Sequence, residues 1–287
     1  MARCERFVMA SFPGHLAWVG PSVATLAQMS APGRMRGLSM RDRTRGSALV
    51  MHSRRAPLSM SFSSPARAKF PPTSKTEDEK ERAREALVRA FNSQNVSEEE
   101  IEWFLRDRRF DEQETITKLR KRLQWVSEME RIPLQGNVLA ELQSSKTELH
   151  PKTDKYGRRV LIVRARLHFA SQYGPNSNRK VVKHVLDEAV ASLDPGVETI
   201  MVIIDLKGFS IANADLNLAR YLIEVFFTYY PRRLDQLLFV DAPLVFKPTW
   251  LAIKPLLRSY AQLVSFVKRD DVSEYFRSPA EVPNDFK

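Results

Sequence analysis

Two aspartates directly follow runs of apolar residues that are typical of buried strands. Asp205 follows Ile203-Ile204, and Asp241 follows Phe239-Val240. At the carboxyl edge of a parallel sheet, such a pair could hold a metal ion or perform acid–base chemistry. The alternative is that each aspartate caps the turn or helix behind it, which is a common role of Asp. Capping is favoured, and a metal-dependent enzyme using Asp205 and Asp241 is the outside hypothesis.

Other signatures of catalysis are missing from the sequence. It has no glycine-rich phosphate loop, no G-x-G-x-x-G turn and no G-x-S-x-G elbow. Beyond residue 75 the histidines are His150, His168 and His184, and none pairs with another at metal-ligand spacing. The single cysteine, Cys4, excludes a disulfide framework. We therefore expect a protein that is not an enzyme and needs no cofactor.

The net charge of +11 is unevenly distributed over the 287 residues. Residues 1–75 contain 12 basic side chains and only two acids, Glu5 and Asp42, whereas residues 76–287 are almost neutral. The tail is rich in Arg and Ser and lacks a sustained apolar period, so we expect it to be disordered. That composition is typical of an organelle transit peptide and favours a plastid, with mitochondrion or cytoplasm as alternatives. The folded part is not expected to bind nucleic acid.

The folded part begins with a helical pattern over residues 76–130. Residues 77–91 are helical in pattern, and two capping boxes, Ser97 with Glu100 and Asp111 with Glu114, precede apolar stripes of helical period. These residues predict a small all-α N-terminal subdomain.

Residues 131–287 alternate between strand and helix patterns. Strands are predicted over 159–163, 199–206, 237–240 and 263–267, and helices over 178–193, 215–230 and 247–257. Such alternation implies crossover units. The predicted fold class is α/β with a mostly parallel sheet.

One of these helical segments carries a bulky apolar stripe. Phe246, Trp250, Ile253 and Leu257 recur on one helix face between stiff proline joints, and Phe226 lies on a second such face. Ordinary core packing explains most residues of this kind. The alternative is a movable segment that closes over an apolar pocket and touches membranes when open. Periodicity alone leaves both interpretations open.

Four sequence blocks, in order, resemble the CRAL-TRIO lipid-binding family, which includes phosphatidylinositol-transfer and tocopherol-transfer proteins. The blocks are residues 104–111 (FLRDRRFD), 154–160 (DKYGRRV), 202–210 (VIIDLKGFS), and 229–234 (YYPRRL) with its continuation through 238–243 (LFVDAP) and 250–257 (WLAIKPLL). The match runs from about residue 80 to the end of the chain.

The resemblance implies a domain over 131–287 whose sheet floors a hydrophobic pocket that is closed by a helical gate. Its ligand would be a phospholipid or another hydrophobic lipid, which a monomer carries or senses through transient contact with a membrane surface. A lipid-dependent protein-interaction module is the alternative. The pocket and gate residues are expected to be Ile200, Val202, Ile204, Phe226, Phe246, Trp250, Ile253 and Leu257.

The residues that would bind a headgroup depart from the family pattern. Arg232 stands where phosphatidylinositol-binding members carry an acid, and their lysine of the last strand maps to Gln262 or Leu263. The positions of choline-binding hydroxyl residues correspond to Ile200 and Val202. Arg108 and Arg109 remain from the N-terminal motif, and with Arg232 they are the candidates for a headgroup phosphate.

Overall fold

The computed structural model describes residues 66–94 and 96–287, so most of the predicted targeting segment lies outside the described residues. Residues 66–75, which the sequence places in that segment, contact the folded part. The Ala66 carbonyl accepts a hydrogen bond from the Glu198 amide at 2.9 Å, and the Phe70 ring meets Trp103 edge-on at 4.9 Å. The folded part therefore begins upstream of Thr76.

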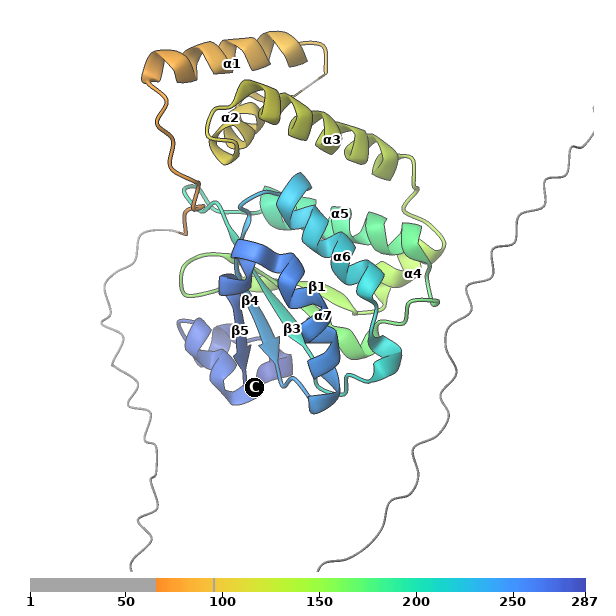
Figure 1. Cartoon of the computed structure of the whole chain (residues 1–287). Coiled ribbons are helices and arrows are strands. Elements are labelled where there is room, and N and C mark those ends of the chain that lie inside the picture. Colours follow the sequence, from red (N-terminus) through yellow and green to blue (C-terminus); the bar gives the residue numbers. More distant parts are fainter. Residues whose placement is uncertain (1–65, 95) are drawn as a thin grey trace, which may run out of the picture. The chain divides into compact units, whose positions relative to one another are not determined.

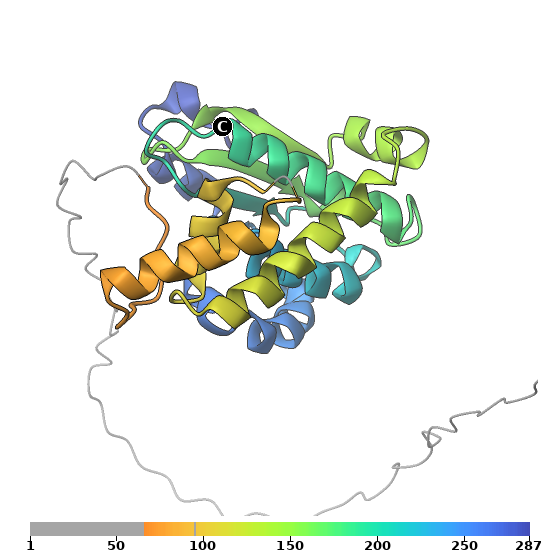
Figure 2. The ribbon, with the colours of Figure 1, turned by 90° about the horizontal axis from the view of Figure 1, so that it is seen from above.

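Three helices follow: α1 (Glu77–Phe91), α2 (Glu98–Asp107) and α3 (Glu112–Glu130). The side chains of Ser97 and Asp111 cap α2 and α3 by accepting from the amides of Glu100 and Glu114, as their positions predict. A shared core holds the three helices together and contains Leu87, Phe91, Ile101, Phe104, Leu105 and Leu119. Figure 2 shows α1 and α3 lying beside each other.

The end of α3 packs on the rest of the chain. Trp125 stacks on Tyr229 at 4.4 Å, and its indole donates to the Tyr221 hydroxyl at 3.0 Å. Trp103 on α2 donates to the Pro231 carbonyl at 2.8 Å. The helical unit is thus joined to the α/β part by buried aromatic side chains.

The α/β part is built on a five-stranded sheet in the order β1-β2-β3-β4-β5 (Figure 1). Its strands are β1 (Thr147–Thr153), β2 (Arg159–Arg164), β3 (Ile200–Asp205), β4 (Leu234–Val240) and β5 (Val264–Val267). The pair β1–β2 is antiparallel and the other three pairs are parallel. The predicted α/β class and mostly parallel sheet are confirmed.

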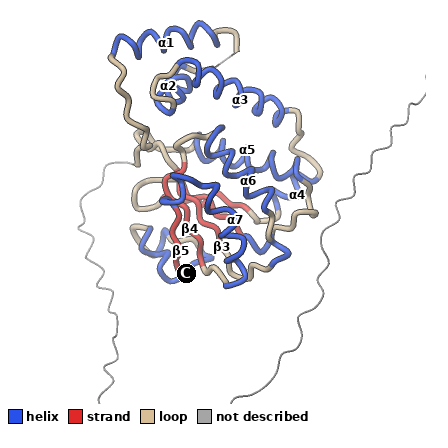
Figure 3. Tube along the Cα trace, viewed as in Figure 1, coloured by secondary structure: helices blue, strands red, loops and turns tan. Residues whose placement is uncertain are grey.

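Alternate residues of the central strands point to opposite faces, as strand geometry requires. One face carries Val160, Ile162, Met201, Ile203, Leu238 and Val240, and it packs against Val272, Phe276, Val282 and Phe286 from the C-terminal 3₁₀ turns. The other face is covered by helices α5 (Pro175–Ala191), α6 (Leu216–Glu224) and α7 (Lys247–Leu257) (Figure 3). The continuous apolar run of β3 is explained by this burial on both faces.

Three features were absent from the predicted pattern. Helix α4 (Asn137–Gln143) and strand β1 precede β2, and the predicted 215–230 helix is α6 followed by a π-helical turn over Val225–Tyr229. No helix among the described residues has both the length and the apolar character needed to cross a bilayer.

Candidate functional site

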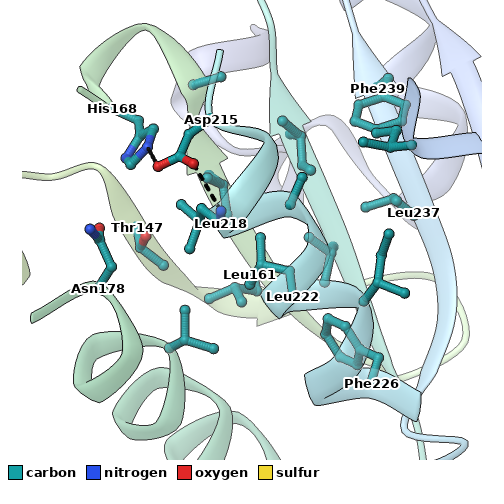
Figure 4. A pocket seen from close by; sticks show the side chains of 18 of the residues that line it. Thr147, Leu161, His168, Asn178, Asp215, Leu218, Leu222, Phe226, Leu237 and Phe239 are labelled. Carbon is teal, nitrogen blue, oxygen red and sulfur yellow. Dashed lines mark hydrogen bonds and ion pairs between the residues drawn. The ribbon is translucent and has the colours of Figure 1, made fainter. Parts of the chain in front are cut away.

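An apolar cavity of about 240 Å³ lies between the sheet and the helices on one of its faces. Alternate residues of three strands form its floor: Leu161, Val163, Val202, Ile204, Leu237 and Phe239. The opposite wall comes from α5, α6 and α7 and includes Val185, Leu222 and Ile253. Figure 4 shows the hydrocarbon side chains converging on this space. A cavity of this chemistry favours an apolar ligand over water.

Six of the eight residues predicted for the pocket and gate line this cavity: Val202, Ile204, Phe226, Phe246, Ile253 and Leu257. The other two, Ile200 and Trp250, do not line it. Ile200 is fully buried in the core at the start of β3 and is not part of the lining. Trp250 lies on the side of α7 toward β5, with its ring 5.7 Å from Phe239 and 5.1 Å from Phe266.

The segment that closes the cavity, residues 243–258, is here called the gate segment. Its inner side places Phe246, Thr249, Ile253 and Leu257 on the cavity, so Thr249 takes the place that the stripe assigned to Trp250. Its outer side leaves Leu244 91% and Leu251 60% exposed. Lys247, Lys254 and Arg258 are exposed as well, and the segment contains no acidic residue. The outer side is therefore both apolar and cationic.

A cluster of buried polar side chains lies at one end of the cavity. Glu141, Lys146, His168 and Asn178 are each less than a tenth exposed and line the cavity with Asp215. Lys146 pairs with Glu141, donates to Asn178 Oδ1 at 2.9 Å and lies 3.5 Å from His168 Nδ1. Figure 4 shows His168, Asp215, Asn178 and Thr147 on the opposite side of the view from Phe226.

His168 connects the two halves of this cluster. Its Nε2 lies 3.2 Å from Asp215 Oδ2, and Asp215 also caps α6 through the amides of Asn217 and Leu218. Burial, and then the charge of Lys146, lower the pKa of His168, so the ring is neutral near neutral pH. A neutral ring that donates from Nε2 to Asp215 accepts from Lys146 at Nδ1.

Sequence reasoning missed this cluster. The spacing of the histidines predicts no metal site, and Lys146 lies in a stretch without a predicted strand. A usable signal was the order of the elements, because His168 and Asp215 each follow a parallel strand and therefore lie near the ligand-binding edge of the sheet.

The three arginines predicted to contact a phosphate meet at a separate surface depression. Arg108 and Arg232 both bind the buried carboxylate of Asp107, at 2.8 and 2.9 Å. Burial raises the pKa of Asp107, but Lys118, Arg108 and Arg232 outweigh it, and the net pKa is lowered. Arg109 is exposed, and its carbonyl accepts from Thr73 at 3.0 Å. The depression thus offers Arg109 and the outer edges of two paired arginines.

Tyr260 separates this depression from the cavity. Its ring lines the cavity, while its hydroxyl accepts from the Arg232 amide at 3.1 Å and donates to the Phe226 carbonyl at 3.2 Å. A ligand that reached both places would have to pass this hydrogen-bonded side chain.

The aspartate pair that could have formed a metal site is bridged by an arginine. Arg269 donates to Asp205 at 3.2 Å and to Asp241 at 3.1 Å, and Arg166 donates to Asp205 at 2.8 Å. Asp205 also accepts from the Lys207 amide at 3.0 Å, which is the turn-capping role. Among the described residues, no group of three or more His, Cys, Asp or Glu is placed to hold a metal ion.

Comparison with known proteins identifies a family for the α/β part of the chain. The family model of the CRAL/TRIO domain matches residues 143–284. A CRAL-TRIO domain-containing protein of Schizosaccharomyces pombe is 25% identical over 197 residues, which are 61% of this chain and 44% of that protein. A phosphatidylinositol transfer protein of Eremothecium gossypii is 31% identical over 131 residues, which are 45% of this chain and 30% of that protein. The chain thus spans less than half the length of either relative.

A solved structure shows the same fold. The crystal structure of Sfh5 superposes with a TM-score of 0.55 at 16% identity and covers 70% of this chain and 85% of that chain. The matched residues 143–284 contain all five strands and the gate segment. Residues 143–284 of the chain therefore form a domain of the CRAL/TRIO family.

Proposed function

We propose that this protein binds a lipid in the apolar cavity and moves it between membranes, or senses it, without catalysing a reaction. The observation that carries the proposal is the cavity itself, whose floor is hydrocarbon and whose lining is apolar except at the polar end. The gate segment has apolar side chains on both of its sides. Each buried CH₂ contributes about 0.8 kcal/mol, so an acyl chain is held without a specific polar contact. The names of relatives in this family, among them a phosphatidylinositol transfer protein, support the same class of ligand.

The gate segment explains how lipid could leave a bilayer. Its exposed leucines would enter the lipid interface, and its three cations would be attracted to anionic headgroups at about 1 kcal/mol each. Movement of the same helix would then uncover Ile253 and the cavity behind it. Transient membrane contact and cavity opening are therefore one event in this proposal, and a monomer suffices for it.

Transfer between vesicles tests the proposal. The full chain is mixed with donor vesicles that contain labelled lipid and with unlabelled acceptor vesicles, and the label is followed with and without protein. We expect transfer to rise in proportion to protein concentration for at least one lipid class. Lipid that is bound but never delivered would favour the alternative, a module that uses lipid to recruit protein partners. No binding of any lipid class would contradict the proposal.

Arg108, Arg109 and Arg232 are proposed as the contacts for a headgroup phosphate, should the ligand be a phospholipid. Support comes from their convergence on one depression. Against a strong phosphate site, Asp107 already neutralises much of the charge of two of them. Loss of phosphatidylinositol transfer in an Arg109→Gln variant, with transfer of uncharged lipid unchanged, would support this role.

We also propose that the Arg- and Ser-rich tail is a transit segment to a plastid. Its composition supports this proposal. Because the Ala66 carbonyl accepts hydrogen bonds from Glu198 and Thr199, we propose a cleavage upstream of residue 66. A reporter fused to residues 1–65 should enter the organelle, and a diffuse cytosolic signal would contradict the proposal.

A further inference from the structure

The polar end of the cavity contains one hydroxyl that is free to bind a ligand. Thr147, at the start of β1, lines the cavity beside Asn178, and its hydroxyl makes no hydrogen bond to any other described residue (Figure 4). Around it the polar groups are already paired with one another. A polar ligand atom at this end would therefore meet Thr147 and whatever bonding capacity the neighbouring cluster has left.

The hydrogen-bonding capacity that the polar cluster has left is mostly capacity to accept hydrogen bonds. Lys146 directs its three N–H groups at Glu141, Asn178 and His168, and the Asn213 amide donates to the carbonyls of Arg166 and His168. The Asn178 amide donates one of its two N–H groups to the Gly174 carbonyl, so a single N–H donor remains there. The carboxylates accept fewer bonds than they can. Glu141 accepts from Lys146 and Ser177, and Asp215 accepts from two amides and His168, whereas a carboxylate offers about four acceptor sites.

The net charge of the cluster also favours an uncharged ligand that donates a hydrogen bond. Lys146 is the only cation among its members, against the carboxylates of Glu141 and Asp215, because burial keeps His168 neutral. A phosphate or carboxylate placed here would be buried beside a net negative charge, which is strongly unfavourable. An uncharged hydroxyl placed here would donate to a carboxylate and exchange a hydrogen bond with Thr147.

We infer that the ligand of this cavity is an uncharged lipid whose polar end carries a hydroxyl group, seated between Thr147 and the carboxylates of the polar cluster. This inference rests on the proposed lipid-binding function and names the class of lipid. It also separates the cavity from the arginine depression, where a phosphate would bind.

Two pairs of probes test the charge and the hydroxyl separately. Diacylglycerol and phosphatidic acid with the same acyl chains differ by the phosphate, and hexadecanol and its methyl ether differ by the hydroxyl proton. Each is offered to the full chain in phosphatidylcholine vesicles, and protein-bound probe is measured after the vesicles are removed. We expect about tenfold more diacylglycerol than phosphatidic acid, and more alcohol than ether.

The variant Thr147→Val removes the hydroxyl with little change in shape. It should weaken hexadecanol binding about fivefold, the effect of one hydrogen bond of about 1 kcal/mol, and leave the ether unchanged. Thr153→Val makes the same change at the far end of β1, outside the cavity lining, and should alter neither. Circular dichroism checks that both variants fold.

Equal or preferential uptake of phosphatidic acid would overturn the inference, as would an equal loss of alcohol and ether binding in Thr147→Val. Either result leaves the proposed function standing, because lipid is still bound. Absence of all four probes from the protein would instead count against lipid binding itself.

Discussion

Asp107 at the end of α2 and Arg232 just before β4 form an ion pair with 2.9 Å between the Arg232 Nε and the Asp107 Oδ1, across 125 positions of sequence. Arg232 occupies the position at which phosphatidylinositol-binding members of the family are expected to carry an acid. In this chain its guanidinium instead ties the helical unit to the turn before β4. The backbone of Arg232 adopts a positive φ of 63°, which is uncommon for a residue other than glycine.

The first prediction concerns this ion pair. The Asp107 carboxylate is only 4% exposed and forms ion pairs with Arg108, Lys118 and Arg232. The substitution Asp107→Asn removes its negative charge and leaves these three cations close together. We expect the free energy of unfolding to fall by about 3 kcal/mol, as when one partner of a buried pair is removed. Chemical denaturation measures it. Glu112→Gln, an exposed acid on α3, is the control and should change stability by less than about 0.5 kcal/mol. Equal effects of both variants would contradict this role of Asp107.

A second prediction is a loss of stability in mild acid. The pKa of His168 is lowered by burial and then by Lys146, so the unfolded chain binds this proton more tightly than the folded chain. Stability from this group is present at neutral pH and declines as the pH falls below the ordinary His value near 6.5. We expect the unfolding midpoint to drop between about pH 7 and about pH 5, with a smaller drop in His168→Gln.

Asp215 does not account for such a drop. Burial raises its pKa, but hydrogen bonds from Leu218 and His168 outweigh it, so the net pKa lies below the ordinary value of 3.8. Its titration therefore acts only at more acidic pH. An identical pH profile in the wild-type chain and in His168→Gln would contradict the assignment to His168.

A third prediction fills the cavity. Ala219 on α6 lines it, and a phenyl ring in its place would occupy the space of the ligand. Overpacking costs about 1–3 kcal/mol, so we expect Ala219→Phe to retain about tenfold less lipid. Ala90→Phe adds the same ring to an exposed position of α1 and serves as the control. Unchanged lipid retention by Ala219→Phe would show that the ligand lies elsewhere.

A fourth prediction separates transfer from binding. Leu251 is 60% exposed on the outer side of the gate segment and does not line the cavity. Burial of a leucine side chain in a bilayer contributes about 1.5–3 kcal/mol of binding free energy, which the substitution Leu251→Asp removes. Transfer between vesicles should therefore slow about tenfold or more. Lipid already bound in the cavity should be retained with unchanged affinity. Parallel loss of both would place Leu251 in the ligand path, contrary to the structure.

Much of the fold could be predicted because apolar periodicity reports burial directly. The strand around Ile203 and the helix that contains Ile253 lie where their patterns placed them. Strand β1 was missed because its burial is irregular and Pro151 interrupts it. A strand at the edge of a sheet carries little of the period that makes central strands recognisable.

The site was harder to predict than the fold. A stripe of helical period identifies a face but not what the face contacts, so Trp250 and Thr249 could not be distinguished from the pattern. Ile200 and Ile204 lie on the same side of one strand, yet only Ile204 reaches the cavity. Their different positions along the strand determine which of the two contacts the cavity. The polar cluster joins Lys146 to His168 across 22 positions through tertiary packing that no local pattern encodes.

The central claim is that the cavity holds a lipid, and native mass spectrometry of the purified full chain tests it most directly. After incubation with a membrane extract and removal of free lipid, we predict one lipid bound per chain, and its mass identifies the class. The bound fraction should fall in Ala219→Phe and remain in Ala90→Phe. A wild-type chain that carries no lipid under these conditions, or that carries it equally in Ala219→Phe, would contradict the account.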